Sequence, residues 1–178
     1  VPLTAGTQLY LDFEGTVGGN TFTDLSDNAN VMTLVGTPVL SATQVDHGTV
    51  SLETFGDGGY ITTPYSTANF DWWTDTYSIE ARVYADSFAD WAYFQSSMLI
   101  GNAQATGNIN YWAFGVLANG GLHFHYYNGG GASVFSAAGA VPTGQWVTLK
   151  MTHDSGTINL FIDDVLVASG AVAGTPQS

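Results

Sequence analysis

Apolar and polar residues alternate with a period of two along much of this chain, a period typical of half-buried β-strands. The clearest example runs from Gly144 to Val167, where two alternating segments flank the polar turn Asp154-Ser155-Gly156. A second tight turn is expected at Asp163-Asp164, because this polar pair separates two further apolar segments. This part of the chain is therefore predicted to form consecutive hairpins.

The same alternation predicts strands in most of the remaining sequence. Glycine-rich runs separate the alternating segments, and no stretch shows the 3.6-residue period of a helix. Many short strands with glycine-rich turns and no intervening helices favour a β-sandwich or a β-barrel. The expected strands are Gln8–Glu14, Val31–Val35, Thr49–Thr54, Tyr60–Thr63, Tyr77–Ala85, Met98–Gly101, Tyr111–Leu117, Leu122–Tyr127, Trp146–His153, Ile158–Ile162 and Val165–Ala168.

Successive side chains of a strand point to opposite faces, so the alternation also predicts which residues form the core. The larger apolar residues on the inward side of neighbouring strands should pack together. The expected core contains Trp112, Phe114, Leu122, Phe124, Tyr126, Trp146, Leu149, Met151 and Leu160.

The outward positions of the long strands form a candidate binding face. If these strands share one sheet, aromatic rings, hydrogen-bonding groups and both basic residues lie on its exposed side, which suits a sugar. An ordinary solvated sheet surface explains the same residues without a ligand. The candidate ligand-binding residues are Glu80, Arg82, Tyr111, His123, His125, Tyr127 and Lys150.

Length and charge limit the classes of function. A chain of 178 residues is long enough for one sizeable core, and we expect a single domain over residues 1–178. With 15 acidic and 2 basic residues the net charge is −13, which argues against binding to nucleic acid or to anionic lipid. No apolar run is long enough to span a bilayer, so membrane insertion is not expected. The chain contains no cysteine, which excludes disulfides and thiol chemistry.

Catalytic constellations are missing from the sequence. No predicted strand carries two carboxylates on one face as glycosidases of a β-sandwich require, since Glu80 is alone on its strand. Asp12 and Glu14 do alternate correctly, but they stand where the strand is expected to end. No Gly-x-Ser-x-Gly motif and no phosphate-binding loop occur. We therefore expect that the chain is not an enzyme.

Two groups of residues have the composition of metal ligands. Asp24, Asp27 and Asn28 offer clustered oxygens of the kind that Ca²⁺ accepts, although an Asx-rich turn explains them without metal. His123 and His125 stand two positions apart and so share one face, where they could bind zinc or copper, but no third ligand is visible. We expect no cofactor, with structural calcium as the alternative.

The order of these segments resembles the laminin-G-like (concanavalin A-like) jelly-roll family. The resemblance is carried by Leu9–Gly15, by the stretch Tyr77–Tyr84, by the hairpin between Tyr111 and Tyr127, and by Gly144-Gln145-Trp146 with the alternating segments that follow. It implies an all-β fold, an antiparallel β-sandwich of jelly-roll type. It also implies a non-catalytic recognition or structural module.

The segments Phe70–Glu80 and Tyr111–Gly115 are most similar to laminin-G-like domains of phage structural proteins. This resemblance implies an extracellular or virion location, as a capsid decoration or fibre or as part of another surface protein. The expected partners are a surface glycan or neighbouring subunits of a larger assembly. The alternative is a carbohydrate-binding module of a secreted enzyme or adhesin, and a glycoside hydrolase on the same fold is the third possibility.

The family normally adds one or two closing strands beside its opening strand, here Leu9–Glu14. In this chain the last hairpin is followed by the small and polar residues 170–178. We therefore expect either that the sequence is a piece of a longer polypeptide or that one sheet edge is covered by a partner.

Overall fold

The structure is a computed structural model, and it describes residues 6–54, 59–64, 76–89, 96–101, 110–128 and 131–171. At several strand ends it describes the backbone but not the side chains, namely at Ser96, Ser97, Asn110, Tyr111, Tyr127, Asn128 and Gly131. The chain divides into two compact units, Val1–Asp71 (unit 1) and Trp72–Ser178 (unit 2), and each is described by itself. That residues 1–178 form one domain stays a prediction.

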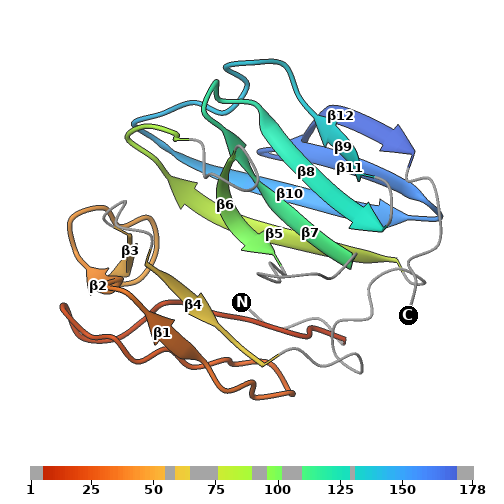
Figure 1. Cartoon of the computed structure of the whole chain (residues 1–178). Coiled ribbons are helices and arrows are strands. Elements are labelled where there is room, and N and C mark those ends of the chain that lie inside the picture. Colours follow the sequence, from red (N-terminus) through yellow and green to blue (C-terminus); the bar gives the residue numbers. More distant parts are fainter. Residues whose placement is uncertain are drawn as a thin grey trace. The chain divides into compact units, whose positions relative to one another are not determined.

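Unit 1 contains two small antiparallel sheets of two strands each (Figure 1). One pairs β1 (Thr33–Val35) with β4 (Tyr60–Thr62), and the other pairs β2 (Val39–Ser41) with β3 (Ser51–Glu53). Three of these strands lie within predicted ranges. β2 was not predicted, because Pro38, Val39 and Leu40 are consecutive apolar residues and show no alternation.

The prediction of a strand over Gln8–Glu14 is wrong. Among the residues that the structure describes, this segment has no strand partner, and Phe13 has a φ of 55°, which interrupts an extended backbone. The N–H of Tyr10 donates instead to the carboxylate of Asp24, at 2.9 Å. The Tyr10 carbonyl accepts in turn from the Leu25 N–H at 2.9 Å, so these described hydrogen bonds join the segment to a loop rather than to a sheet.

Unit 2 contains two antiparallel four-stranded sheets that are packed face to face (Figure 1). The β10 sheet has the order β12-β11-β10-β5, and the β8 sheet has the order β6-β7-β8-β9. The strands are β5 (Tyr77–Tyr84), β6 (Ser96–Gly101), β7 (Asn110–Leu117), β8 (Leu122–Asn128), β9 (Gly131–Phe135), β10 (Trp146–Asp154), β11 (Thr157–Ile162) and β12 (Val165–Ala171).

The all-β antiparallel sandwich predicted from the sequence is confirmed. Seven of these eight strands overlap predicted ranges, and β9 was missed because it begins inside a glycine-rich run. Within the described ranges there is no helix of the length and apolarity that crossing a membrane requires.

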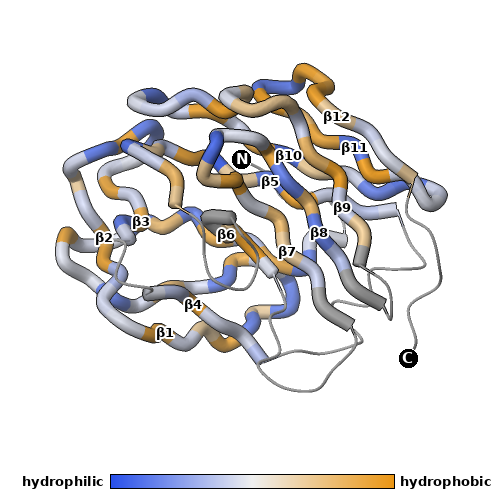
Figure 2. Tube along the Cα trace, turned by 45° about the horizontal axis from the view of Figure 1, so that its top comes forward, coloured by the Kyte–Doolittle hydropathy of each residue, from blue (hydrophilic) through white to orange (hydrophobic). Residues whose placement is uncertain are grey.

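The core of unit 2 lies between the two sheets and is built from alternate residues of each strand. Orange and paler or blue segments succeed one another along these strands in Figure 2. Eight of the nine predicted core residues are buried in one cluster: Trp112, Phe114, Leu122, Phe124, Tyr126, Leu149, Met151 and Leu160. Each such side chain contributes about 1.5–3 kcal/mol when it leaves water, so this cluster holds the sheets together.

Trp146 is the exception, and its assignment to the core was wrong. Trp146 lies two and four positions before Thr148 and Lys150 and so points to the same side of β10 as they do. The buried residues of β10 are Val147, Leu149 and Met151, which point to the other side. A strand places neighbours in sequence on opposite faces, so Trp146 lies on the outer face and is partly exposed.

Two tight turns shape the β10 sheet, and both were predicted. Ser155 and Gly156 between β10 and β11 have φ values of 49° and 79°, and Asp163 and Asp164 between β11 and β12 have 46° and 62°. Two consecutive positive φ values are typical of the type I′ turn, whose twist matches that of the flanking strands. Asp163 adds a contact to β10, because its carboxylate accepts a hydrogen bond from the Thr148 N–H at 2.8 Å.

Candidate functional site

The outer surface of β5 and β10 gathers aromatic, basic and hydrogen-bonding side chains. The register pairs Tyr84 with Trp146, Arg82 with Thr148 and Glu80 with Lys150, and all six residues point away from the core. We call these six residues the β5–β10 face. Its position follows from the antiparallel pairing of two long strands, which places their outward side chains in adjacent rows.

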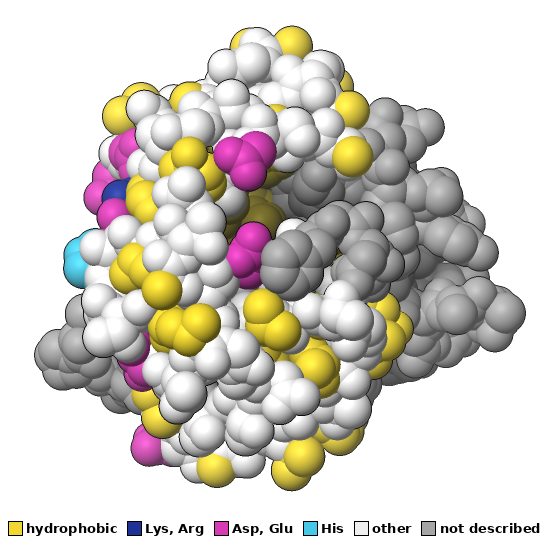
Figure 3. Space-filling model, turned by 90° about the vertical axis from the view of Figure 1, so that its left-hand side faces the viewer, with side chains coloured by type: hydrophobic (Ala, Val, Ile, Leu, Met, Phe, Trp, Pro, Cys, Tyr) yellow, Lys and Arg dark blue, Asp and Glu magenta, His cyan; other side chains and the backbone are white. Residues whose placement is uncertain are grey.

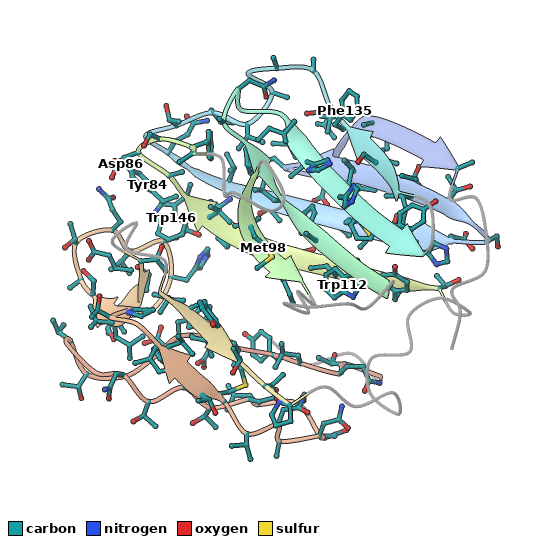
Figure 4. The ribbon with its side chains drawn as sticks, viewed as in Figure 1. Tyr84, Asp86, Met98, Trp112, Phe135 and Trp146 are labelled. Carbon is teal, nitrogen blue, oxygen red and sulfur yellow. The ribbon has the colours of Figure 1, made fainter. Side chains whose placement is uncertain are left out.

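Two aromatic rings form one end of this face. The ring centroids of Tyr84 and Trp146 are 5.8 Å apart and their planes are inclined by 59°. Both side chains are partly exposed, and Figure 4 shows them together at the end of β5, with Asp86 close to Tyr84. The N–H of Gly144 donates to the carbonyl of Ala85 at 2.9 Å, which fixes the segment leading into β10 next to the end of β5. The pair offers ring surface on which an apolar sugar face can stack.

Both basic residues of the chain lie on the β5–β10 face. Arg82 Nη1 is 3.2 Å from the Thr148 hydroxyl and 3.5 Å from an oxygen of Asp163. These groups are well exposed, so an ion pair of this kind contributes only about 0–1 kcal/mol to stability.

Lys150 has two acidic neighbours. Its ammonium nitrogen lies 3.7 Å from Glu80 and 4.0 Å from Asp164, both of which are exposed. With Asp163 beside Arg82, three carboxylates therefore surround two cations. On the side of the molecule drawn in Figure 3, the visible basic side chain likewise lies among acidic ones. The face carries no surplus of positive charge and suits a ligand that presents hydroxyl groups rather than anions.

The prediction that the histidines share this face is wrong. Arg82, Lys150 and Glu80 belong to the β10 sheet, whereas His123 and His125 lie on β8 in the other sheet. Parity predicts which side of a strand faces outward, but it does not predict which strands pair. The two long hairpins that were expected to share one sheet in fact lie in opposite sheets.

Tyr111 and Tyr127, the other two predicted ligand-binding residues, also belong to the β8 sheet. They are register partners on β7 and β8, and their side chains lie outside the described residues. No ligand-binding role of the seven predicted residues is tested by the structure, and three of the seven contribute to the β5–β10 face.

The two histidines of β8 lie side by side, with ring centroids 5.9 Å apart. Only 7% of His123 is exposed, although it points to the outer side of its sheet, and its Nδ1 has no hydrogen-bond partner. Burial, together with the charge of His125, lowers the pKa of His123 to about 4. Burial also lowers the pKa of His125, whose Nδ1 lies 2.7 Å from the Ser133 hydroxyl. Both imidazoles are therefore neutral at pH 7.

Asp24 is the centre of a compact hydrogen-bond cluster in unit 1. Only 4% of Asp24 is exposed, and backbone N–H groups of Tyr10, Ser26 and Asn30 donate to its carboxylate at 2.8–2.9 Å. The Ser26 hydroxyl donates at 2.8 Å and the Asn30 amide at 2.6 Å. Burial opposes ionisation, but the hydrogen bonds outweigh it and lower the pKa of Asp24 to about 2.

This cluster bears on the calcium prediction for Asp24, Asp27 and Asn28. Both oxygens of Asp24 already accept hydrogen bonds, and the side-chain amide of Asn28 donates to Gln8 at 2.7 Å instead of turning an oxygen toward Asp24. Asp27 is exposed. In the part of the chain that the structure describes, no three acidic, histidine or cysteine side chains come together as a metal site. An Asx-rich turn accounts for the described contacts, and calcium binding stays a prediction.

Comparison with known proteins places this sandwich in a family. Residues 55–178, well over half of the chain, match the family described as the concanavalin A-like lectin/glucanases superfamily. The chain belongs to this superfamily. The laminin-G-like resemblance seen in the sequence is thereby confirmed, and the Phe70–Asp75 part of the phage-like motif lies outside the described residues.

Other comparisons add little to this assignment. No curated protein matches the chain. A crystal structure of residues 221–444 of an S-layer domain-containing protein from Clostridium thermocellum has a TM-score of 0.46 and 18% identity. The alignment covers 94% of this chain and 74% of that one. At this level of similarity, the comparison carries no inference about what this superfamily member binds.

Because the superfamily name includes glucanases, the carboxylates of unit 2 are of interest. A glycosidase acid needs an environment that favours its protonated form, such as an apolar pocket. All described carboxylates of unit 2 are instead exposed on strands or turns, namely Glu80, Asp86, Asp154, Asp163 and Asp164.

Sequence reasoning missed three members of the β5–β10 face, namely Tyr84, Thr148 and Trp146, and also missed Asp163 beside it. Tyr84 lies two positions from Arg82, and Trp146 lies four positions from Lys150, so their outward direction could have been predicted from the alternation. Only the tertiary structure brings Asp163 to Arg82, because the two residues stand 81 positions apart.

Proposed function

We propose that this chain is a non-catalytic recognition module of an extracellular surface protein, and that it binds a glycan through the β5–β10 face. The observation that carries the proposal is the Tyr84–Trp146 ring pair, which adjoins the hydrogen-bonding groups of Arg82 and Thr148. Stacking on aromatic rings with polar groups at the edge is how proteins hold sugar rings. The proposal that the module is non-catalytic is supported by the described carboxylates of unit 2, because all of them are exposed.

Charge favours a neutral glycan over an acidic one. The net charge of the chain is −13, and three carboxylates adjoin the two basic residues of the face. An anionic sugar would meet repulsion both at long range and at the site. Hydroxyl groups, in contrast, can both donate to the carboxylates and accept from Arg82 and Lys150.

The experiment is a glycan array with the purified chain, followed by affinity electrophoresis on the best neutral polysaccharide. Trp146→Ala should reduce retention at least tenfold, because it removes half of the ring pair. Phe135→Ala is the matched control, since it removes an aromatic ring that is 62% exposed on the other sheet. Equal retention of wild type and Trp146→Ala would show that the β5–β10 face is not the binding site.

The kind of surface is the finer part of the proposal. The sequence resemblance to laminin-G-like domains of phage structural proteins favours a virion, where the domain would decorate a capsid or fibre beside neighbouring subunits. Immunogold labelling with an antibody against the chain should then mark phage particles from the source culture. Label found only on cell envelopes would contradict the virion location and would indicate a cell-surface adhesin instead.

A further inference from the structure

We propose that His123 and His125 bind a single Cu(I) ion on the outer side of β8. The two imidazoles project from the same face of one strand, two positions apart, in a part of the molecule that the β5–β10 face does not include. The proposal is independent of glycan binding.

The spacing of the rings fits two bonds to one metal. A ring nitrogen lies about 1.2 Å from its centroid and a metal–nitrogen bond measures about 2.0 Å. When one nitrogen of each ring points at a shared ion, centroids 5.9 Å apart correspond to a nitrogen–metal–nitrogen angle of about 135°. This angle lies between the trigonal and linear arrangements that Cu(I) adopts with few ligands, and it is wider than the tetrahedral angle that Zn²⁺ prefers.

The two rings differ in how they are held, and each arrangement suits a ligand. His123 is more than nine-tenths buried and its Nδ1 has no hydrogen-bond partner, which is a costly state for a ring nitrogen. The Ser133 hydroxyl lies 2.7 Å from Nδ1 of His125 and orients that ring, as an outer hydrogen bond does in metal sites. A metal ion would satisfy the buried nitrogen of His123.

The two strands that flank β8 set the surroundings of the rings. Across from His123 and His125, β7 carries Gly115 and Ala113, so no side chain larger than a methyl group stands beside either ring on that strand, whereas β9 places Phe135 beside His123 and Ser133 beside His125. On the far side of Gly115 the register places Met98 of β6, which is labelled in Figure 4. Its thioether is a soft donor, and soft donors select Cu(I).

The electrostatics of the site also favour a cation. The net charge of −13 attracts positive ions to the chain. Among the described residues, neither ring has a Lys or Arg side chain as its register partner on β7 or β9.

The donor set discriminates between metals. Structural and catalytic zinc sites use three or four protein ligands. Among the described side chains, no group of three His, Cys, Asp or Glu forms around the pair. Cu(I) is satisfied by two nitrogen ligands with or without a thioether, and no cysteine elsewhere in the chain competes for it.

The test is an anaerobic competition in which the full chain is titrated into the coloured Cu(I)–bicinchoninate complex at pH 7. Wild type should withdraw one equivalent of Cu(I) per chain. His125→Ala should weaken the binding at least tenfold. His47→Ala is the matched control and should change nothing, because His47 is exposed and lies beside Asp46 instead.

Two outcomes would overturn the proposal. One is a wild-type chain that leaves the bicinchoninate complex intact, and the other is His125→Ala that binds Cu(I) as tightly as wild type. Circular dichroism of His125→Ala and of a second variant, His125→Gln, shows whether each variant is folded. Weaker Cu(I) binding by a folded variant means that a ligand has been lost. In a parallel arm with Zn²⁺, tighter binding of zinc than of Cu(I) would also refute the choice of metal.

Discussion

Replacing Asp24 with Asn is the most informative perturbation of unit 1. The carboxylate accepts five hydrogen bonds from Tyr10, Ser26 and Asn30, and the Tyr10 bond joins residues 14 positions apart. An asparagine at this position keeps one oxygen acceptor, but its NH2 group would face donors. Buried N–H groups would therefore lose their partners.

The magnitude follows from the pKa. A shift from 3.8 in the unfolded chain to about 2 in the folded chain means that ionised Asp24 stabilises the fold by about 2 kcal/mol. The folded-state pKa is the lower one, so this contribution is present above pH 3.8 and is lost as the pH falls toward 2. In Asp24→Asn, the N–H donors that face the new NH2 group add to this loss. We expect the free energy of unfolding to fall by about 2–4 kcal/mol in total at pH 7.

The assay must report on unit 1, and all five tryptophans of the chain lie in unit 2. Amide hydrogen exchange at Tyr10, Ser26 and Asn30 is suitable, because these N–H groups donate directly to Asp24. In Asp24→Asn their exchange should accelerate by at least tenfold at pH 7.

The control is Asp27→Asn, the same substitution at an exposed position three residues away, which should leave exchange unchanged. In urea unfolding followed by far-UV circular dichroism, the stability difference between wild type and Asp24→Asn should shrink as the pH falls from 4 to 2. Equal exchange rates in Asp24→Asn and Asp27→Asn would refute the reasoning. So would a stability difference between wild type and Asp24→Asn that does not depend on pH in this range.

Three further predictions concern unit 2. Phe124→Ala should destabilise the sandwich by about 3–5 kcal/mol in urea unfolding followed by tryptophan fluorescence, whereas Phe135→Ala should cost less than about 1 kcal/mol, since Phe124 is fully buried and Phe135 is 62% exposed. Equal costs would show that the register of β8 is wrong. Asp164→Gly should raise the melting temperature by a few degrees, because glycine adopts the φ of 62° without strain, and a lower melting temperature would contradict this. Gly170→Ala should cost about 1–3 kcal/mol, because its Cβ would lie 2.7 Å from Val134 on β9, and an unchanged urea midpoint would contradict that contact.

The fold of unit 2 was largely predictable, because alternation is a local signal that every long strand repeats. β5, β7, β8, β10 and β11 all appear where the pattern predicts them. The failures have local causes. β2 begins in a run of consecutive apolar residues and β9 begins in a run of glycines, so neither strand shows a period of two.

The site was less predictable, as Trp146 and Asp24 show. Trp146 was assigned to the core because it is large and apolar, although its parity with Lys150 pointed outward. For Asp24, the sequence showed only a cluster of oxygens. The donors that fill its carboxylate come from a segment 14 residues earlier and from the turn that follows, and no spacing rule predicts that set.

By itself, the sequence determined most strands of unit 2, the inward and outward faces of those strands, the turns at Ser155-Gly156 and Asp163-Asp164, and the family. These properties depend on neighbours within a few residues, because the period of two and the turn chemistry are local. Only the tertiary structure decided which strands pair. That pairing places Arg82 and Lys150 with Trp146 on one sheet and His123 with His125 on the other. Pairing depends on contacts between residues far apart in the sequence, so the composition of a binding surface emerges only when the sheets have formed.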